Sequence, residues 1–206
     1  MKKKGEPCTA SDRAERIILE HDGVIRTSVA IQAGIHPRTI YQLRDSGKLE
    51  QLARGVYKLA ESGSSSNPDL VAVAVKIPRA VICLVSALAF HEITTQIPHK
   101  ISISLPAGSK APIFDFPPIQ VHKFSSASYS AGIEEHQIDG VSIKIYSPEK
   151  TIADCFKFRN KIGMDIVLEA LKLYRNRFKT DYNKLLGYGE ICRVKKVMLP
   201  YLEAGL

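Results

Sequence analysis

The sequence predicts an α+β protein of two domains: a small helical domain with a hairpin, then a larger mixed α/β domain with a small sheet. Residues 61–68 are small, polar and turn-forming, and they separate two stretches of periodic hydrophobicity. Before this segment, the apolar residues first recur with a helical period and then alternate with polar ones. After it, stretches with a helical period and stretches of alternation follow one another along the chain. We therefore expect a first domain at 1–60, a linker at 61–68 and a second domain at 69–206.

Three short helices are expected in the first domain. Asp12 and Glu15 have capping-box spacing at the start of the first helix. Thr27 is a plausible cap for a second helix, which Gly34 ends, because glycine accepts the left-handed backbone found after helices. Pro37 suits the first turn of a third helix, where its missing N–H has no cost.

A β-hairpin is expected after the three helices. The runs 49–52 and 56–59 alternate with period two around Ala53-Arg54-Gly55. The second and third helices have the spacing of a helix-turn-helix, so the helices and the hairpin together predict a winged helix-turn-helix. A small three-helix domain that packs on another protein is the alternative. The residues that carry the spacing are Ala30, Gly34, Ile40 and Leu43.

The outer face of the third helix is the expected DNA-reading surface. If Ile40 and Leu43 pack inward, the polar side chains around them point toward the major groove, where Arg suits guanine and Gln suits adenine. Basic residues of the hairpin would hold the DNA backbone or enter the minor groove. The candidate DNA-binding residues are Arg26, Thr27, Arg38, Thr39, Tyr41, Gln42, Arg44, Lys48, Arg54 and Lys58.

The second domain alternates between helical and strand-like patterns. Its strands have polar residues between apolar ones, which is typical of a half-buried sheet. One helix begins at Ser147-Pro148, with serine as the cap and proline in the first turn. We expect strands at 80–85, 101–105, 119–122 and 141–145, and helices at 69–77, at 86–93, from 148 and from 164 to 178.

Composition and charge favour a soluble protein with a polyanionic partner. Hydrophobic residues make up 45% and charged residues 24% of the 206 residues, as in ordinary globular proteins. Lysine and arginine number 29 against 21 acidic residues, and residues 157–206 alone carry 11 basic and 5 acidic side chains. The longest apolar run, 80–90, is too short to span a membrane, so we expect a cytoplasmic protein without a membrane partner.

Neither metal sites nor common catalytic signatures are visible in the sequence. The four cysteines lie far apart, which predicts buried reduced thiols and no bound metal or cofactor. Phosphate-binding, dinucleotide-binding, nucleotidyltransferase and nuclease patterns do not occur. His91, Glu92 and Asp154 remain as acid/base candidates, but a hydrogen-bonded His91 and an ion-paired Asp154 are favoured. We expect no catalytic residues; a catalytic C-terminal domain is the less favoured alternative.

Residues 23–57, GVIRTSVAIQAGIHPRTIYQLRDSGKLEQLARGVY, resemble the antitoxin-type regulators of the AbiEi class, found in abortive-infection and type IV toxin–antitoxin systems. The segments 86–94 and 147–159 extend this resemblance more weakly into the second domain. The resemblance implies an antitoxin of a phage-defence system that represses its own operon by binding inverted repeats in double-stranded DNA. Its functional partner would be a nucleotidyltransferase-like toxin, with direct contact left open. An orphan winged-helix regulator without a toxin is the alternative.

Overall fold

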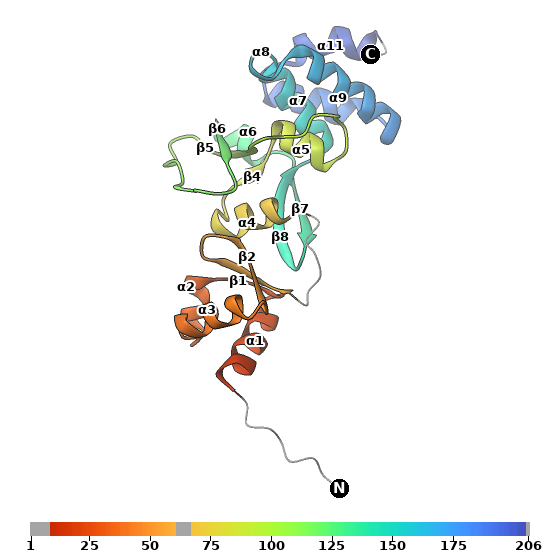
Figure 1. Ribbon diagram of the computed structural model, residues 1–206. Coiled ribbons are helices and arrows are strands. Elements are labelled where there is room, and N and C mark those ends of the chain that lie inside the picture. The colour runs from red at the N-terminus through yellow and green to blue at the C-terminus, as the bar shows by residue number, and fades with distance from the viewer. Residues whose placement is uncertain (1–8, 61–66, 205–206) are drawn as a thin grey trace. The chain divides into compact units, whose positions relative to one another are not determined.

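The computed structural model describes residues 9–60 and 67–204, which form two compact units of an α+β protein (Figure 1). Unit 1 contains the described residues up to Pro78 together with the short segment Gln137–Ser142. Unit 2 contains Arg79–His136 and the described residues from Ile143 onward. Most of the expected linker, residues 61–66, lies outside the described residues.

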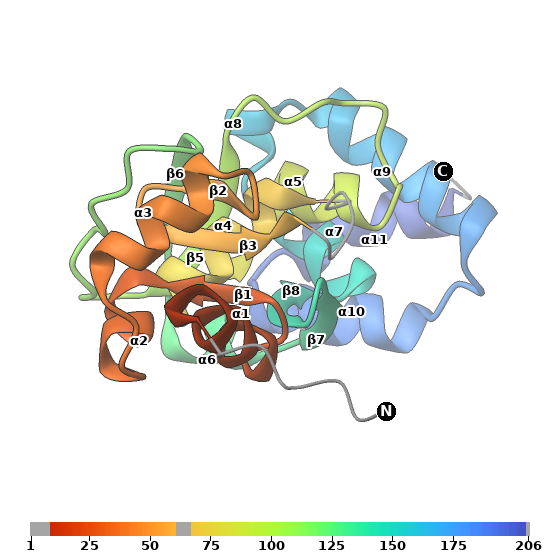
Figure 2. The ribbon, with the colours of Figure 1, turned by 60° about the horizontal axis from the view of Figure 1, so that its bottom comes forward.

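Unit 1 has three helices on one face of a three-stranded antiparallel sheet and a fourth helix on the other face (Figures 1 and 2). The strands lie in the order β1-β3-β2, so the third strand occupies the centre. The elements are α1 (Ala10–Glu20), β1 (Val24–Arg26), α2 (Thr27–Gln32), α3 (Pro37–Asp45), β2 (Leu49–Ala53), β3 (Val56–Leu59) and α4 (Pro68–Lys76).

The central strand β3 is buried on both of its faces. Tyr57 and Leu59 pack into a core with the helices α1 to α3. Val56 points to the opposite face, because side chains alternate along a strand, and it is also fully buried. Helix α4 packs against all three strands, and its Val71 has no exposed surface. Helix α4, expected at the start of the second domain, therefore belongs to unit 1.

We expect Val71→Ala to loosen the sheet of unit 1. Removing two buried methyl groups leaves a small cavity against the strands and should cost about 1–3 kcal/mol. Hydrogen exchange followed by mass spectrometry should show faster exchange of the β3 amides, with the unit 2 peptides unchanged. Val75→Ala, at a half-buried position of the same helix, is the matched control. If only unit 2 peptides exchanged faster, α4 would pack in the core of unit 2 and its assignment to unit 1 would be wrong.

A turn at Asp139–Gly140 supplies the second segment of unit 1. Both residues have positive φ, at 50° and 75°, as in the Asp-Gly turns that join tight hairpins. A Cβ at Gly140 would lie 2.2 Å from the Cβ of Asp22, so only glycine fits this approach. Asp139 also forms an ion pair with Lys58, at 3.3 Å.

A five-stranded mixed sheet with the order β6-β5-β4-β8-β7 lies mainly in unit 2, and only the joined ends of β7 and β8 fall within the unit 1 segment Gln137–Ser142. Strands β5 and β6 are parallel, β4 and β8 are parallel, and β4 and β5 are antiparallel. The strands are β4 (Val81–Ile82), β5 (Ile101–Pro106), β6 (Ile119–Phe124), β7 (Ile133–Ile138) and β8 (Val141–Tyr146). The helices are α5 (Leu84–Phe90), α6 (Ser126–Ser130), α7 (Pro148–Lys157), α8 (Arg159–Ile162), α9 (Met164–Arg177), α10 (Tyr182–Ile191) and α11 (Lys195–Glu203).

Helix α7 forms the centre of unit 2. It packs against α5, α8, α9, α10 and α11, and its residues from Lys150 to Phe156 are all buried. Ser147 caps it as expected, with its hydroxyl accepting a hydrogen bond from the Lys150 amide at 3.3 Å. The buried Cys155 is one of three cysteines that are free and buried, with Cys83 and Cys192, as predicted; Cys8 lies outside the described residues.

Two expected helix starts in unit 1 are corrected. The capping box of α1 involves Thr9 and Asp12, not Asp12 and Glu15: the Thr9 hydroxyl accepts from the Asp12 amide at 3.1 Å, and the Asp12 carboxylate accepts from the Thr9 amide at 2.9 Å. Thr27 is the first residue of α2, and Arg26 precedes it without a side-chain cap. Pro37 occupies the first turn of α3, as predicted.

Candidate nucleic-acid interface

A tight turn joins α2 and α3 and sets the angle between them. Gly34 has φ of 89°, a left-handed backbone that a side chain would strain. The Ile35 amide then donates to the Ala30 carbonyl at 2.9 Å, and the Ile35 side chain enters the core. This turn holds α3 in one orientation, with one face toward the core and the other face outward.

The two faces of α3 separate as the sequence predicts for most residues. Ile40 and Leu43 are buried against α1 and the sheet, with 0% and 1% of their surface exposed. Arg38, Tyr41 and Gln42 are exposed on the outer side. Their hydrogen-bonding groups are therefore available to a ligand that approaches this helix.

Two other candidate residues of α3 are placed differently. Thr39 is only 8% exposed and faces α1, so it does not belong to the outer face. Arg44 is half-buried, and its Nε and Nη2 atoms both donate to one carboxylate oxygen of Asp45, at 2.9 and 2.7 Å. This ion pair raises the pKa of Arg44 and partly neutralises its charge.

The tip of the β2–β3 hairpin lies against the start of α2. The Thr27 amide donates to the Gly55 carbonyl at 3.0 Å, and Arg26 is opposite Val56 in the sheet. A Cβ at Gly55 would lie 3.2 Å from the Thr27 hydroxyl, so glycine allows this close contact. The structure thus brings Arg26, Thr27 and Arg54 to one end of the sheet, although Thr27 and Arg54 are 27 positions apart in the sequence.

The two candidate lysines beside the hairpin are engaged within the protein. The Lys48 ammonium forms an ion pair with Glu15 of α1 at 2.8 Å. Lys58 is 1% exposed and pairs with Asp139. Lys58 was expected to contact DNA beside the hairpin tip, but its face of β3 is covered, so Lys58 does not extend the exposed basic surface.

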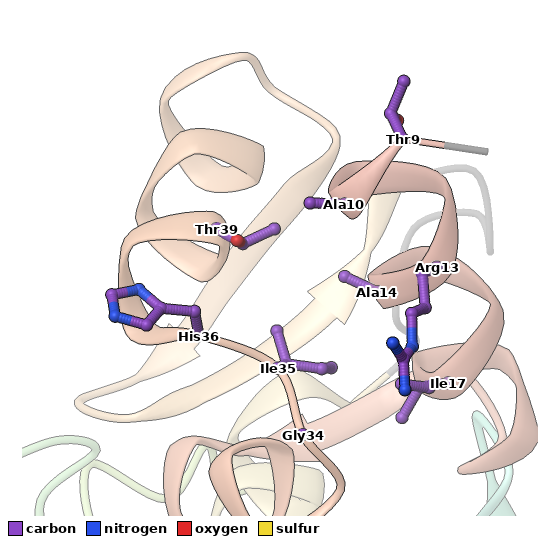
Figure 3. A pocket seen from close by; sticks show the side chains of 9 residues that line it. All are labelled: Thr9, Ala10, Arg13, Ala14, Ile17, Gly34, Ile35, His36 and Thr39. Atoms are coloured by element: carbon purple, nitrogen blue, oxygen red, sulfur yellow. The ribbon is translucent and has the colours of Figure 1, made fainter. Parts of the chain in front are cut away.

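A cavity of about 460 Å³ between α1 and the α2–α3 turn adds two residues that the sequence analysis did not select (Figure 3). Arg13 lines it from α1 and His36 from the turn. The Nδ1 atom of His36 accepts from the Arg38 amide at 3.2 Å, which leaves Nε2 as the N–H donor. Both side chains suit a phosphate, and only tertiary packing brings them together.

The acid/base candidates of unit 2 form separate structural contacts. His91 is 9% exposed, and its Nε2 donates to the Tyr146 carbonyl at 2.7 Å, so the predicted hydrogen-bonded role is confirmed. Burial lowers the pKa of His91. Glu92 forms an exposed ion pair with Arg177.

Asp154 is fully buried and takes part in two contacts. It accepts from the Lys150 ammonium at 2.5 Å and from the Cys192 thiol at 3.2 Å, which confirms the predicted ion pair with a neighbouring base. Desolvation raises the pKa of Asp154, while Lys150 acts in the opposite direction. The carboxylate is thus enclosed in the core of unit 2.

No helix among residues 9–60 and 67–204 is long and apolar enough to cross a membrane. Within the same ranges, no group of three or more His, Cys, Asp or Glu side chains is arranged to hold a metal ion.

Comparison with known structures supports the fold. The chain is similar to the RV2827C protein from Mycobacterium tuberculosis, known from a crystal structure, with a TM-score of 0.51 and 13% sequence identity. The match covers 94% of this chain and 80% of that chain, so the shared fold extends through both units. No curated protein matches the chain.

The family comparison concerns unit 1 alone. Residues 12–60, from α1 through the hairpin, match the model of a transcriptional-regulator family described as the AbiEi antitoxin. This segment contains the α2–α3 turn, the outer face of α3 and the hairpin tip described above. The resemblance to AbiEi antitoxin regulators is therefore confirmed over residues 12–60.

Proposed function

We propose that this protein is a sequence-specific DNA-binding transcriptional repressor and the antitoxin of a type IV, AbiE-like toxin–antitoxin system that acts in phage defence. One observation carries the proposal: within a segment that matches AbiEi regulators, α3 buries Ile40 and Leu43 and exposes Arg38, Tyr41 and Gln42. A helix with such faces, preceded by a tight turn, suits the major groove of DNA.

The connectivity of unit 1 supports a winged helix-turn-helix. The order α1-β1-α2-α3-β2-β3, with β3 between β1 and β2, places a hairpin after the helix that would enter the groove. In the proposed complex Arg38 and Gln42 contact base edges, while Arg54 and Thr27 contact the DNA backbone at the hairpin end. Arg13 and His36 add backbone contacts beside the α2–α3 turn.

The proposed operator is an inverted repeat upstream of the protein's own operon, occupied by two copies. One winged domain covers a short half-site, and a two-fold arrangement doubles the contacts. The proposed toxin is nucleotidyltransferase-like, and unit 2 counteracts it in the cytoplasm as a binding or regulatory module. The hydrogen bonds of His91 and Asp154 to structural groups favour this role over catalysis.

The test of DNA binding separates base contacts from backbone contacts. Arg38→Ala and Gln42→Ala should each weaken binding to the operator by about 1–3 kcal/mol, because a bidentate contact to one base is lost. Arg54→Ala should weaken operator and random duplex alike and reduce the salt dependence, because a phosphate contact is lost. Fluorescence anisotropy with both duplexes at matched salt measures each variant.

Lys172→Ala, at an exposed position of α9 in unit 2, is the control for net charge. It should leave operator binding unchanged. Equal losses on operator and random duplex for Arg38→Ala, Gln42→Ala and Arg54→Ala would show that α3 does not read sequence. Failure of the unmodified protein to prefer the operator would refute the proposed function.

A further inference from the structure

Unit 2 contains a second cavity, of about 450 Å³, that the proposed DNA-binding and antitoxin roles do not use. It is lined by residues of the parallel strands β5 and β6, the start of α5, the segment α8–α9, and the loop 94–100 that follows α5. Ligand sites are typically concave and combine apolar walls with a few placed polar groups. The cavity has both kinds of lining.

The apolar part of the lining comes from side chains that are distant in sequence. Leu84 from the start of α5 and Ile119 from β6 contribute to it. Ile162 at the end of α8 and Ile166 on α9 also contribute, and the remaining apolar residues of the lining are Val85, Ile97 and Pro98. These aliphatic groups suit the flat or apolar body of an organic molecule.

The polar part of the lining combines neutral side chains, Gln96, Ser102 and Gln120, with basic ones. Lys100 and His99 approach from the loop, and Lys161 approaches from α8. Among the described residues that line the cavity none is acidic, and neither lysine has an ion-pair partner in the part of the chain that the structure describes. Two uncompensated ammonium groups at one cavity favour an anion.

His122 gives an independent sign that this cavity has unused hydrogen-bonding capacity. His122 lines the cavity and is 8% exposed, and its ring packs edge-on against that of Phe158, with 5.2 Å between the ring centroids. Its Nε2 atom is buried and has no hydrogen-bond partner within the described residues. Burial and, to a smaller extent, the nearby Lys161 lower the pKa of His122. A buried polar atom without a partner has a free-energy cost, which a polar ligand group can relieve.

The loop that presents Lys100 is fixed at both ends. At its start, Thr94 and Thr95 donate hydroxyl hydrogen bonds to Glu169 of α9, at 2.9 and 2.6 Å. At its end, the Ser86 hydroxyl donates to the Lys100 carbonyl at 3.3 Å and accepts from the Ser102 amide at 2.9 Å. A cavity wall held in this way loses little conformational freedom when a ligand binds.

The backbone is strained at Leu84, one of the residues that line the cavity. Leu84 has φ of 47°, a left-handed conformation that costs on the order of 1–3 kcal/mol for such a residue. Strained residues of this kind concentrate at ligand-binding sites, where the surrounding structure holds them. The strain therefore agrees with the lining in marking this cavity.

We propose that the cavity binds a small organic anion, with its phosphate or carboxylate group between Lys100 and Lys161 and its apolar body against Leu84, Ile119 and Ile166. The site is independent of the proposed DNA-binding surface, which lies on unit 1. A DNA backbone would satisfy the lysines but leave the apolar lining unused. The combined lining thus favours a small amphipathic ligand.

Phenyl phosphate is a suitable probe, with inorganic phosphate and phenol as its two halves. Titrations of the full-length ¹⁵N-labelled protein should show saturable shifts of the amides of Lys100, Gln120 and Ile162. Phenyl phosphate should bind at least about tenfold more tightly than either half, because it engages both linings. Lys100→Gln and Lys161→Gln should each weaken it about fivefold, the upper range for an exposed ion pair.

Ile166→Ala should weaken phenyl phosphate and leave inorganic phosphate unchanged, which separates the apolar from the ionic contribution. Lys172→Gln, an exposed α9 lysine outside the cavity, should change neither ligand. Shifts that do not saturate, or equal losses in Lys161→Gln and Lys172→Gln, would overturn the proposal. So would lysine variants that weaken retention of random duplex DNA while phenyl phosphate binding stays intact, because the lysines would then serve a nucleic-acid backbone. Failure of operator binding alone would leave this site untouched.

Discussion

Replacing Asp154 by alanine should destabilise unit 2 by about 3–5 kcal/mol, the cost of leaving a buried ammonium group without its counter-ion. Lys150 and Asp154 are both fully buried one turn apart on α7, and their ion pair is 2.5 Å long. The ammonium also lies 4.2 Å from the ring centroid of Tyr146 and 5.0 Å from that of Phe124. These rings stabilise the cation only weakly by comparison with a carboxylate.

Replacing both partners by apolar residues separates the cost of a broken pair from the cost of lost packing. Lys150→Met with Asp154→Leu removes both charges, so we expect it to be more stable than Asp154→Ala and close to the unmodified protein. Chemical denaturation of the full chain, followed by circular dichroism, measures the free energy of unfolding. Glu203→Ala, at an exposed position of α11, is the control and should stay within about 0.5 kcal/mol. A double variant less stable than Asp154→Ala would contradict the explanation.

The local structure of unit 1 could be predicted largely from sequence, because caps and turns are encoded by neighbouring residues. Gly34, Pro37 and the Arg54-Gly55 turn have the roles expected of them. The predicted capping box of α1 was placed three residues too late. Both Thr9 and Asp12 can cap a helix, and only the folded chain selects Thr9. Strand β1 was not predicted, because three residues are too few for a visible alternation.

The sequence does not predict which element packs against which face of a helix or strand. The apolar face of α4 is evident in the sequence, but nothing in that pattern says that the helix covers the sheet of unit 1. The expectation that Lys58 contacts DNA failed for the same reason. The strand around Lys58 was predicted correctly, but only tertiary packing shows that the side chain is buried. Strand β7 was missed because Glu134, Glu135 and His136 interrupt any alternation of apolar residues.

The candidate site divides in the same way. The exposure of Arg38, Tyr41 and Gln42 follows from the helical period once Ile40 and Leu43 are assigned to the core. The contributions of Arg13 and His36, and the whole cavity beside β5 and β6, depend on segments that only folding brings together. Helical and strand periods predict which face of an element is polar, but not which other element faces it.

Ile40→Ala should abolish operator binding while leaving unit 2 folded. Ile40 has no exposed surface and packs at the middle of α3 in a core shared with α1 and the sheet. The truncation should cost about 2–5 kcal/mol, a large share of the stability of so small a unit. Hydrogen exchange should show faster exchange of α1 to β3 peptides and unchanged α7 and α9 peptides, and anisotropy should show loss of the operator complex.

Ile40→Ala and Asp154→Ala together test the proposed division of labour without cutting the chain. In cells that express the proposed nucleotidyltransferase-like toxin, Ile40→Ala should still rescue growth, because unit 2 retains its core. Asp154→Ala should lose rescue but keep operator binding at a temperature where unit 1 stays folded. The Lys150→Met, Asp154→Leu variant should regain rescue if Asp154 acts only through stability. A well-folded double variant that binds the operator but fails to rescue would instead show that the Lys150–Asp154 pair has a direct part in antitoxin activity.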